Sequence, residues 1–311
     1  MLEGTARDSN APDYQPSWPG FIWRDSRESA DSGPAGRPPR GVKAIRNLEF
    51  ARTSGSKLLL DLYVPAASAG PLPVIAWVHG GGWRSGDKEP CPAVPMAAKG
   101  YAVASISYRL SGEAVFPAQI EDCKAAIRWL RANASTYKLD PDRIGAWGSS
   151  AGGHLVALLG TAVNTKEFDT GENLAFSSRV QAVCDFYGPT DFLQMDAHAT
   201  PGSAVLHGLP MSPESLLIGG PIQENRDKVV EANPITYVAS DSAPFLIVHG
   251  DEDRRVPLHQ SRLLYDALKR AGVEAELVVV KGGGHGGPQF RKPDIRGKVE
   301  AFFDKQLKPA A

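Results

Sequence analysis

Two patterns of apolar residues alternate along the chain from residue 42 onward. The first is a short continuous apolar run, as at 74–78 and 245–248, which is typical of parallel strands covered on both faces. The second is a longer segment in which apolar residues recur at helical spacing. The first pattern predicts strands at 43–49, 58–64, 73–79, 101–107, 143–149, 180–187, 244–250 and 275–280. The second predicts helices at 88–99, 118–135, 151–162, 226–232, 258–271 and 293–307.

The order of these segments predicts the fold class. Strands and helices alternate, which is the pattern of a doubly wound α/β sheet with helices on both faces. No helix is predicted between the first two strands, so we expect them to form an antiparallel hairpin that starts the sheet. The prediction is therefore an α/β fold with a mostly parallel, eight-stranded sheet.

The chain is predicted to form one main domain with an arm and an insertion. Residues 1–41 are rich in Pro, Gly, Ser and charged residues and have no apolar period, so we expect a loosely ordered N-terminal arm. Residues 42–311 are predicted to form the domain, with an insertion at about 188–235. In the insertion, Ser212 followed by proline is typical of a helix start, and Gly219 is typical of a helix end.

The composition is that of an ordinary globular protein, with 42% hydrophobic and 22% charged residues. A formal net charge of −1 gives no electrostatic basis for binding nucleic acid or an anionic membrane. No apolar run approaches the roughly 20 residues of a membrane-spanning helix. The sequence as given shows no signal peptide, which leaves open both a cytoplasmic location and secretion with the signal removed. The oligomeric state is also left open.

The cysteines are few and do not form a metal-binding pattern. Cys91, Cys123 and Cys184 are an odd number with no metal-like spacing. Cys184 falls in a predicted buried strand and Cys123 in a predicted helix, so we expect them to pack as small apolar groups. We predict no disulfide, no metal and no cofactor.

The segment 148–152 fits the motif G-x-S-x-G and lies between a predicted strand and a predicted helix. The chain must turn sharply there, and the flanking glycines remove side chains that would clash. Ser150 is the candidate nucleophile, because it alone has glycines two residues before and after it, whereas Ser149 does not. A serine hydroxyl is a weak nucleophile by itself. The motif therefore predicts a base, an acid that orients the base, and donors for an oxyanion.

The candidate base and acid both follow this motif in the chain. His285 lies among glycines after a predicted strand, and an imidazole titrates near neutral pH. Asp253 is selected over Asp251 and Glu252 by the spacing G-x-x-D-x-x-V-P at 250–257. Its carboxylate would hold the ring of His285 in one tautomer and stabilise the imidazolium.

The candidate oxyanion donors lie in the segment 79–83, His-Gly-Gly-Gly-Trp, which follows a predicted strand. We expect the backbone N–H groups of Gly81, Gly82 and Ala151 to form the oxyanion hole. Glycine suits this position because the backbone must approach the substrate closely. The segment lacks G-x-G-x-x-G and the lysine of phosphate-binding loops, which disfavours phosphate binding.

Two aromatic residues near these motifs, Trp83 and Tyr187, are candidates for substrate binding. We expect the insertion to wall one side of the same site. Other histidines are interpreted as structural: His79 orders the glycine loop, His154 packs within a helix, and His249 is buried at the end of a strand.

These motifs resemble those of the bacterial HGGxW branch of the α/β-hydrolases, close to the hormone-sensitive-lipase-like esterases. The similarity runs from about residue 43 to 307, and the dual-function feruloyl and acetyl-xylan esterases are the most similar group. The chain order serine, aspartate, histidine is also that of the α/β-hydrolases. The resemblance implies the α/β-hydrolase fold, the triad Ser150, Asp253 and His285, and the oxyanion hole Gly81, Gly82 and Ala151.

The activity that the resemblance implies is that of a serine carboxylesterase, which forms an acyl-enzyme and needs no cofactor. The arm lacks the pattern of a helical lid, so we expect an open site that admits small-molecule or polysaccharide-linked esters, such as acetyl or feruloyl esters of plant polysaccharide. Two alternatives stay open. One is a different acyl hydrolase on the same scaffold, such as an arylformamidase or a lipase, and the other is a non-catalytic binding protein.

Overall fold

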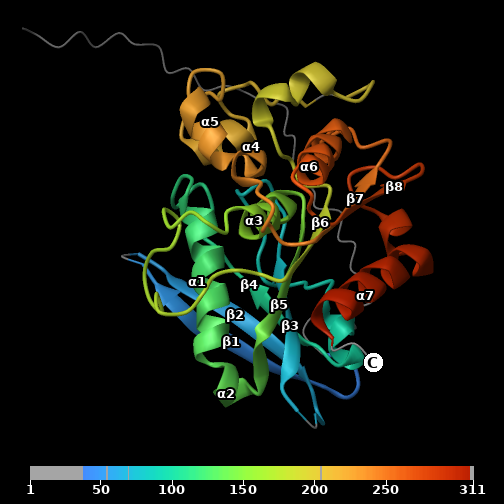
Figure 1. Ribbon diagram of the computed structural model, residues 1–311. Helices are drawn as coiled ribbons and strands as arrows, with labels where there is room; N and C mark the ends of the chain where they lie inside the picture. Colours follow the sequence, from blue (N-terminus) through green and yellow to red (C-terminus); the bar gives the residue numbers. More distant parts are fainter. Residues whose placement is uncertain (1–37, 54, 69, 204, 309–311) are drawn as a thin grey trace, which may run out of the picture. The chain divides into compact units, whose positions relative to one another are not determined.

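The computed structural model describes residues 38–53, 55–68, 70–203 and 205–308. They are built around one eight-stranded sheet (Figure 1). The strands are β1 (Val42–Arg52), β2 (Lys57–Pro65), β3 (Leu72–Val78), β4 (Ala102–Ile106), β5 (Leu139–Ser149), β6 (Ala182–Phe186), β7 (Phe245–Gly250) and β8 (Ala275–Val280). Their order across the sheet is β1-β2-β4-β3-β5-β6-β7-β8.

The pairing of the strands confirms the predicted fold class. β1 pairs antiparallel with β2, and β2 with β4, whereas the other neighbours pair in parallel. All eight predicted strands are present with shifted ends, and the antiparallel hairpin starts the sheet as expected. The inner strand β7 is buried along its whole length because both faces of the sheet are covered.

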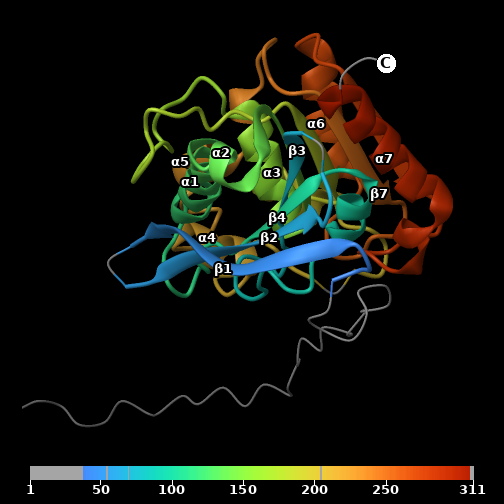
Figure 2. The ribbon, with the colours of Figure 1, turned by 90° about the horizontal axis from the view of Figure 1, so that it is seen from below.

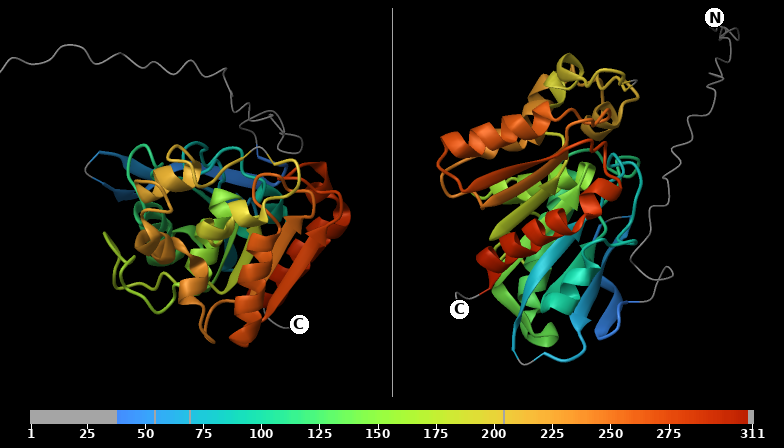
Figure 3. Two further views of the ribbon diagram at one scale, coloured as in Figure 1. Left: turned by 90° about the horizontal axis from the view of Figure 1, so that it is seen from above. Right: turned by 90° about the vertical axis from the view of Figure 1, so that its right-hand side faces the viewer.

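Helices cover the two faces of the sheet in separate layers. The α-helices are α1 (Ala118–Ala132), α2 (Ala134–Tyr137), α3 (Ala151–Thr161), α4 (Pro213–Ile218), α5 (Arg226–Ala232), α6 (His259–Arg270) and α7 (Pro293–Leu307). Ile127 of α1, Leu155 of α3 and Leu264 of α6 belong to one apolar core. Val299 and Phe303 of α7 belong to a second core. Figure 2 shows α1 and α3 on one side of the strands and α7 on the other, and Figure 3 gives the same arrangement from two more directions.

One predicted helix is largely wrong. The segment 88–99 forms only a short 3-10 helix at Val94–Lys99. The cause is its three prolines, Pro90, Pro92 and Pro95, because proline lacks a backbone N–H and its ring clashes with the preceding helical turn. The predicted helix 118–135 is present as α1 and α2, which are separated at Asn133.

The insertion at 188–235 contains α4 and α5 (Figure 1). The predicted start and end of its short helix are confirmed. The hydroxyl of Ser212 accepts the N–H of Ser215 at 3.0 Å, and Gly219 ends the helix with φ of 82°. Figure 1 shows α4 and α5 beyond the carboxyl ends of the parallel strands, whereas α2 lies at the opposite end.

The predicted N-terminal arm, 1–41, lies outside the described residues except for 38–41, so its boundary stays a prediction. The strands and helices above belong to one compact unit. None of the helices in the described ranges is long and apolar enough to cross a membrane.

Candidate active site

The candidate nucleophile lies on a sharp turn between β5 and α3. Ser150 has φ of 55° and ψ of −121°, a strained conformation for a residue with a side chain. Its N–H donates to the carbonyl of Phe186 at 2.8 Å. A Cβ on Gly148 would collide with the backbone of Gly152, and a Cβ on Gly152 would collide with the carbonyl of Val78. Crowding therefore requires both flanking glycines of the motif.

The sheet brings the candidate base and acid to Ser150. Ser150 follows β5, Asp253 follows β7 and His285 follows β8, so all three lie at the carboxyl edge of the parallel strands. The hydroxyl oxygen of Ser150 lies 2.8 Å from Nε2 of His285. Nδ1 of His285 lies 2.7 Å from Oδ2 of Asp253. In this arrangement a hydroxyl proton can pass to an imidazole whose other nitrogen donates to a carboxylate.

Asp253 is fully buried, and its carboxylate accepts several N–H groups. Oδ1 accepts the backbone N–H of Arg255 at 2.8 Å and that of Val256 at 3.0 Å. Burial by itself raises the pKa of a carboxyl group. Here the charge of His285 and hydrogen bonds from His249 and His285 outweigh burial and hold the pKa of Asp253 well below its usual range. The group therefore stays ionised near neutral pH.

The two neighbouring acids are placed elsewhere. Asp251 accepts the backbone N–H of Gly282 at 2.7 Å, and its carboxylate lies 3.1 Å from Nζ of Lys281. Glu252 is exposed. Of the three acids in this segment, Asp253 is the one that meets His285.

The glycine-rich loop 79–83 packs against the turn that carries Ser150. A Cβ on Gly80 would lie 2.9 Å from the carbonyl oxygen of Ser149 and 3.3 Å from Cβ of Ser150. The buried ring of His79 stacks on Tyr108, with 4.3 Å between ring centroids. Its Nδ1 lies 2.7 Å from the carbonyl oxygen of Gly80, and burial lowers its pKa. These contacts favour the interpretation that His79 orders the loop.

The next residues of this loop are the predicted oxyanion donors. Gly81 and Gly82 have φ of +112° and +59°, which favours glycine at both positions. A Cβ on Gly81 would also collide with the carbonyl of Ser85. Ala151 is the first residue of α3, and an N–H in the first helical turn has no partner within its helix. That these N–H groups form an oxyanion hole stays a prediction.

The two aromatic candidates differ in their surroundings. Trp83 is 1% exposed and packs in the core against His154 and Phe192, which favours a structural role over the predicted substrate contact. Tyr187 lies beside the base, with 4.8 Å between its ring centroid and that of His285. Its role in substrate binding stays a prediction.

The insertion reaches the loop that carries Asp253, a contact that the sequence does not reveal. Nε2 of His207 lies 2.9 Å from the carbonyl oxygen of Arg255, and its Nδ1 lies 2.9 Å from Glu214. The hydroxyl of Ser203 donates to the carbonyl of Arg254 at 2.7 Å. No motif surrounds His207, so nothing in the local sequence could have indicated this contact.

The same segment reaches the glycine loop at its other end. A Cβ on Gly82 would lie 3.2 Å from Cβ of Pro213, the first residue of α4. We call residues 203–213 the bridging segment, because it runs from the loop of Asp253 to the glycine loop; residue 204 within it is not described. The contacts agree with the expectation that the insertion walls one side of the site.

Two other predicted structural histidines are placed as expected. His154 is buried, its Nε2 lies 2.7 Å from the carbonyl of Ala232, and burial lowers its pKa to about 4. His249 is buried at the end of β7. Among the residues that the structure describes, no three His, Cys, Asp or Glu side chains are grouped as metal ligands. The three cysteines are buried and free.

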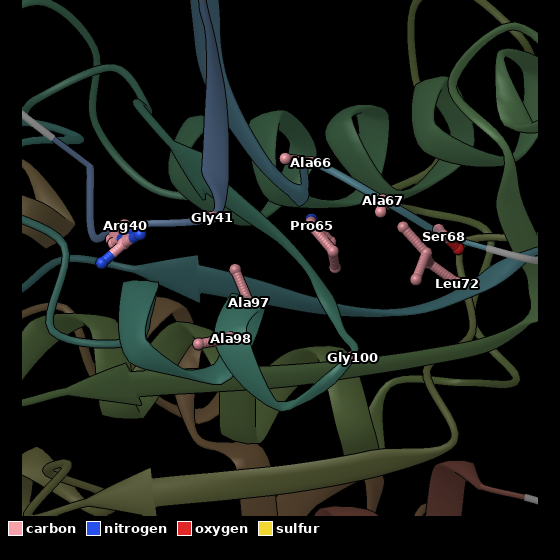
Figure 4. A pocket seen from close by; sticks show the side chains of 10 residues that line it. All are labelled: Arg40, Gly41, Pro65, Ala66, Ala67, Ser68, Leu72, Ala97, Ala98 and Gly100. Atoms are coloured by element: carbon pink, nitrogen blue, oxygen red, sulfur yellow. The ribbon is translucent and has the colours of Figure 1, made fainter.

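A cavity of about 620 Å³ lies at the other edge of the sheet (Figure 4). Leu72 at the start of β3 and Gly100 just before β4 belong to its lining, so it opens at the amino ends of the parallel strands. The full lining is Arg40, Gly41, Pro65, Ala66, Ala67, Ser68, Leu72, Ala97, Ala98 and Gly100. This cavity contains none of the candidate site residues.

Comparison with known proteins gives a family and several relatives. A model of the family described as BD-FAE matches residues 60–268, which is more than half of the chain. The "Probable carboxylic ester hydrolase LipM" of Mycobacterium tuberculosis is 34% identical over 67% of this chain and 48% of its own length. The chain spans about half the length of the curated relatives it matches.

Solved structures with similar folds align over most of this chain. The "Truncated form of carbohydrate esterase from gut microbiota" aligns with a TM-score of 0.78 and 34% identity, over 88% of this chain and 99% of that one. An "acetyl ester-xyloside bifunctional hydrolase from Caldicellulosiruptor lactoaceticus" aligns with a TM-score of 0.66 and 25% identity, over 88% of this chain and 96% of that one.

Proposed function

Because this chain belongs to the BD-FAE family and has the fold of the α/β-hydrolase esterases, we propose that it is a serine-dependent carboxylic ester hydrolase. One observation carries the proposal. The side chains of Ser150, His285 and Asp253 form a continuous hydrogen-bonded chain at the carboxyl edge of the sheet. Relatives whose names describe ester hydrolysis support the same reaction class.

In the first half of the reaction, the hydroxyl oxygen of Ser150 attacks the ester carbonyl carbon while Nε2 of His285 takes the hydroxyl proton. The positive charge that forms on the imidazole is stabilised by Asp253, which remains ionised. The carbonyl oxygen becomes an oxyanion and accepts N–H groups from Gly81, Gly82 and Ala151. Each such donor contributes about 3 kcal/mol to the stability of the transition state.

In the second half, Nε2 of His285 gives its proton to the leaving alcohol, and the acyl group stays on Ser150. Water then attacks the acyl-enzyme while His285 acts as base again, and the acid is released. Every proton in this scheme moves through one imidazole. The only groups required are therefore those that the fold brings to this edge of the sheet.

The proposed substrates are short or aromatic acyl esters, such as acetyl or feruloyl esters of plant polysaccharide. Two similar structures support this class, since their titles describe a carbohydrate esterase and an acetyl ester-xyloside hydrolase. The bridging segment offers apolar surface beside the site, because Leu206, Leu209 and Met211 are 59%, 49% and 69% exposed. Such side chains suit contact with an acyl or aromatic group.

A substrate series tests both the reaction and its specificity. We expect hydrolysis of p-nitrophenyl acetate, acetylated xylan and methyl ferulate, with rates that fall for acyl chains of about ten carbons or more. Preference for the long chains would indicate a lipase, and turnover of N-formyl aromatic amides without ester hydrolysis would indicate an arylformamidase. The control is Ser150→Ala, which should lower kcat by at least about a thousandfold. Absence of all turnover would favour a binding protein.

A further inference from the structure

A second histidine, His249, contacts the carboxylate of Asp253. His249, the penultimate residue of β7, is fully buried. Its Nε2 lies 2.9 Å from the carbonyl oxygen of Val256 and 3.3 Å from Oδ2 of Asp253. Its Nδ1 lies 2.7 Å from the hydroxyl of Ser261 in α6. The proposed reaction uses neither His249 nor Ser261.

The partners of His249 fix which nitrogen carries a proton. A carbonyl oxygen only accepts hydrogen bonds, so Nε2 of His249 must be the donor toward Val256. Oδ2 of Asp253 lies 3.3 Å from the same nitrogen, so this N–H also faces the carboxylate. In the neutral ring Nδ1 is then an acceptor, and the hydroxyl of Ser261 donates to it. Ser261 therefore stabilises the tautomer that presents a donor to Asp253.

The donors around Asp253 are divided between its two oxygens. Oδ1 accepts two backbone N–H groups, those of Arg255 and Val256. Oδ2 accepts Nδ1 of His285 at 2.7 Å and faces Nε2 of His249 at 3.3 Å. Oδ2 is thus the oxygen that aligns the base, and His249 is its second N–H neighbour. A shift of this oxygen would change the direction in which the ring of His285 points.

We infer that His249, with its tautomer fixed by Ser261, is a positioning residue that holds Oδ2 of Asp253 in line with His285. This inference rests on the proposed function, since it assigns a role within the same site. His249 touches no reacting atom, so it acts through Asp253. The link to Ser261 also ties the loop of Asp253 to α6, a rigid element packed against β7 and β8.

The other groups facing His249 do not offer the same contact. From β6 and the residue after it come Asp185, which interacts with His249 electrostatically, and Tyr187, whose ring centroid lies 6.3 Å from that of His249. Oδ1 of Asp185 accepts the N–H of Gly188 at 2.9 Å. The imidazole of His249 is thus hydrogen-bonded to Val256 and Ser261, and its Nε2 also lies 3.3 Å from Oδ2 of Asp253.

Two amide substitutions separate positioning from packing. The side-chain amide of glutamine can place an N–H near the position of Nε2, so His249→Gln keeps a donor toward Asp253. The shorter asparagine reaches only the position of Nδ1, so His249→Asn keeps a partner for Ser261 and loses the donor to Asp253. We propose to measure kcat and KM for p-nitrophenyl acetate per active site, with sites counted by complete labelling with a fluorophosphonate. Ser261→Ala is the third variant.

We expect His249→Asn to lower kcat per labelled site by about 10- to 100-fold with KM unchanged, because a small misplacement of a reacting group is costly. His249→Gln should recover most of that loss, and Ser261→Ala should give a smaller loss of kcat. A purely structural role would instead lower melting temperature and the labelled fraction in the Asn and Gln variants alike, with kcat per labelled site unchanged, and that result would overturn the inference. If wild-type enzyme neither hydrolyses esters nor reacts with the fluorophosphonate, the proposed function itself fails.

Discussion

Two buried aspartates are associated with neighbouring strands of the sheet: Asp253 follows β7 and is 0% exposed, and Asp185 lies in β6 and is 1% exposed. Their carboxylates are held differently. Asp253 accepts two backbone N–H groups and contacts two histidines, and its pKa is lowered. Asp185 accepts one backbone N–H, from Gly188, and burial raises its pKa to about 6. Burial alone therefore does not determine whether a carboxyl group is ionised, because hydrogen-bond donors and nearby charges also shift its pKa.

The local backbone explains why the donors differ. Asp253 lies in a turn, where the N–H groups of the next residues are free to point at its side chain. Asp185 lies within a strand, and a strand commits its own N–H groups to its neighbours in the sheet. Among the described residues, Oδ2 of Asp185 has no hydrogen-bond partner. Asp253, which the proposed reaction needs in its ionised form, thus lies in a turn that supplies hydrogen-bond donors. Asp185 lies in a strand, where its carboxylate has fewer donors.

The largest expected difference between the two aspartates is in catalysis. Asp253→Asn should lower kcat about 10,000-fold, because the amide favours the wrong tautomer of the base. Asp185→Asn removes a charge that the proposed reaction does not use, so its kcat should stay of the same order as wild type. Hydrolysis of p-nitrophenyl acetate by the two purified variants checks this. A comparable loss in both would mean that Asp185 also takes part in the reaction.

The second difference is in the pH dependence of stability. The pKa of Asp185 is about 6 in the folded protein and 3.8 in its ordinary state. As pH rises from about 4 to 6, the unfolded chain loses this proton first, so ionisation favours unfolding and stability is lost. Asn carries no such proton. The stability of Asp185→Asn relative to wild type should therefore increase by about 2 kcal/mol between pH 4 and pH 7.

Asp253 should show the opposite sign. Its folded pKa is lowered, so its ionisation stabilises the fold above the unfolded pKa, and that contribution is lost as pH falls. Asp253→Asn should thus be less stable than wild type at neutral pH, by an amount that shrinks in acid. Urea unfolding of wild type and both variants measures both trends when the pH series runs from neutral pH to below about pH 4, where the carboxyl group of Asp253 becomes protonated in the unfolded chain. If the stability of both variants relative to wild type changed with pH in the same direction, the assignment of the two charge states would be contradicted.

A smaller effect tests the single donor to Asp185. A Cβ on Gly188 would lie 2.6 Å from Oδ1 of Asp185, so Gly188→Ala must displace the carboxylate from its donor. Part of the loss of stability in this variant should come from the backbone of Gly153, because the new Cβ would collide with it as well. A double-mutant cycle with Asp185→Asn isolates the interaction free energy between positions 185 and 188, for which we expect about 1 kcal/mol. Strict additivity of the two free-energy changes of unfolding would show that the displacement does not occur.

The sequence predicts those features that depend on local pattern. Each strand has its own apolar run, and the glycines around Ser150 are required by crowding within one turn, so both are visible in the chain itself. The segment 88–99 has the apolar spacing of a helix, but its three prolines limit it to a short 3-10 helix. Proximity to a motif in the chain does not show which way a side chain points: Trp83 follows the glycines of its loop directly, yet its side chain is buried.

The features that the sequence does not predict depend on contacts between distant segments. Ser261 lies in a helix with no motif, and its partner His249 is known only as a buried strand end until the fold places α6 beside β7. The single donor to Asp185 and the contact between His207 and Arg255 likewise require coordinates. Residue types and spacing thus identify the reacting groups, whereas the supporting contacts come from tertiary structure.

The central claim is that Ser150, activated by His285 and Asp253, carries the reaction. The most direct measurement is to label the wild-type protein with a fluorophosphonate and locate the adduct by peptide mass spectrometry while ester hydrolysis is followed in the same sample. We predict one adduct, on Ser150, and a loss of hydrolysis in proportion to its formation. Hydrolysis that survives complete modification of Ser150, or an adduct that blocks activity from another residue, would contradict the account.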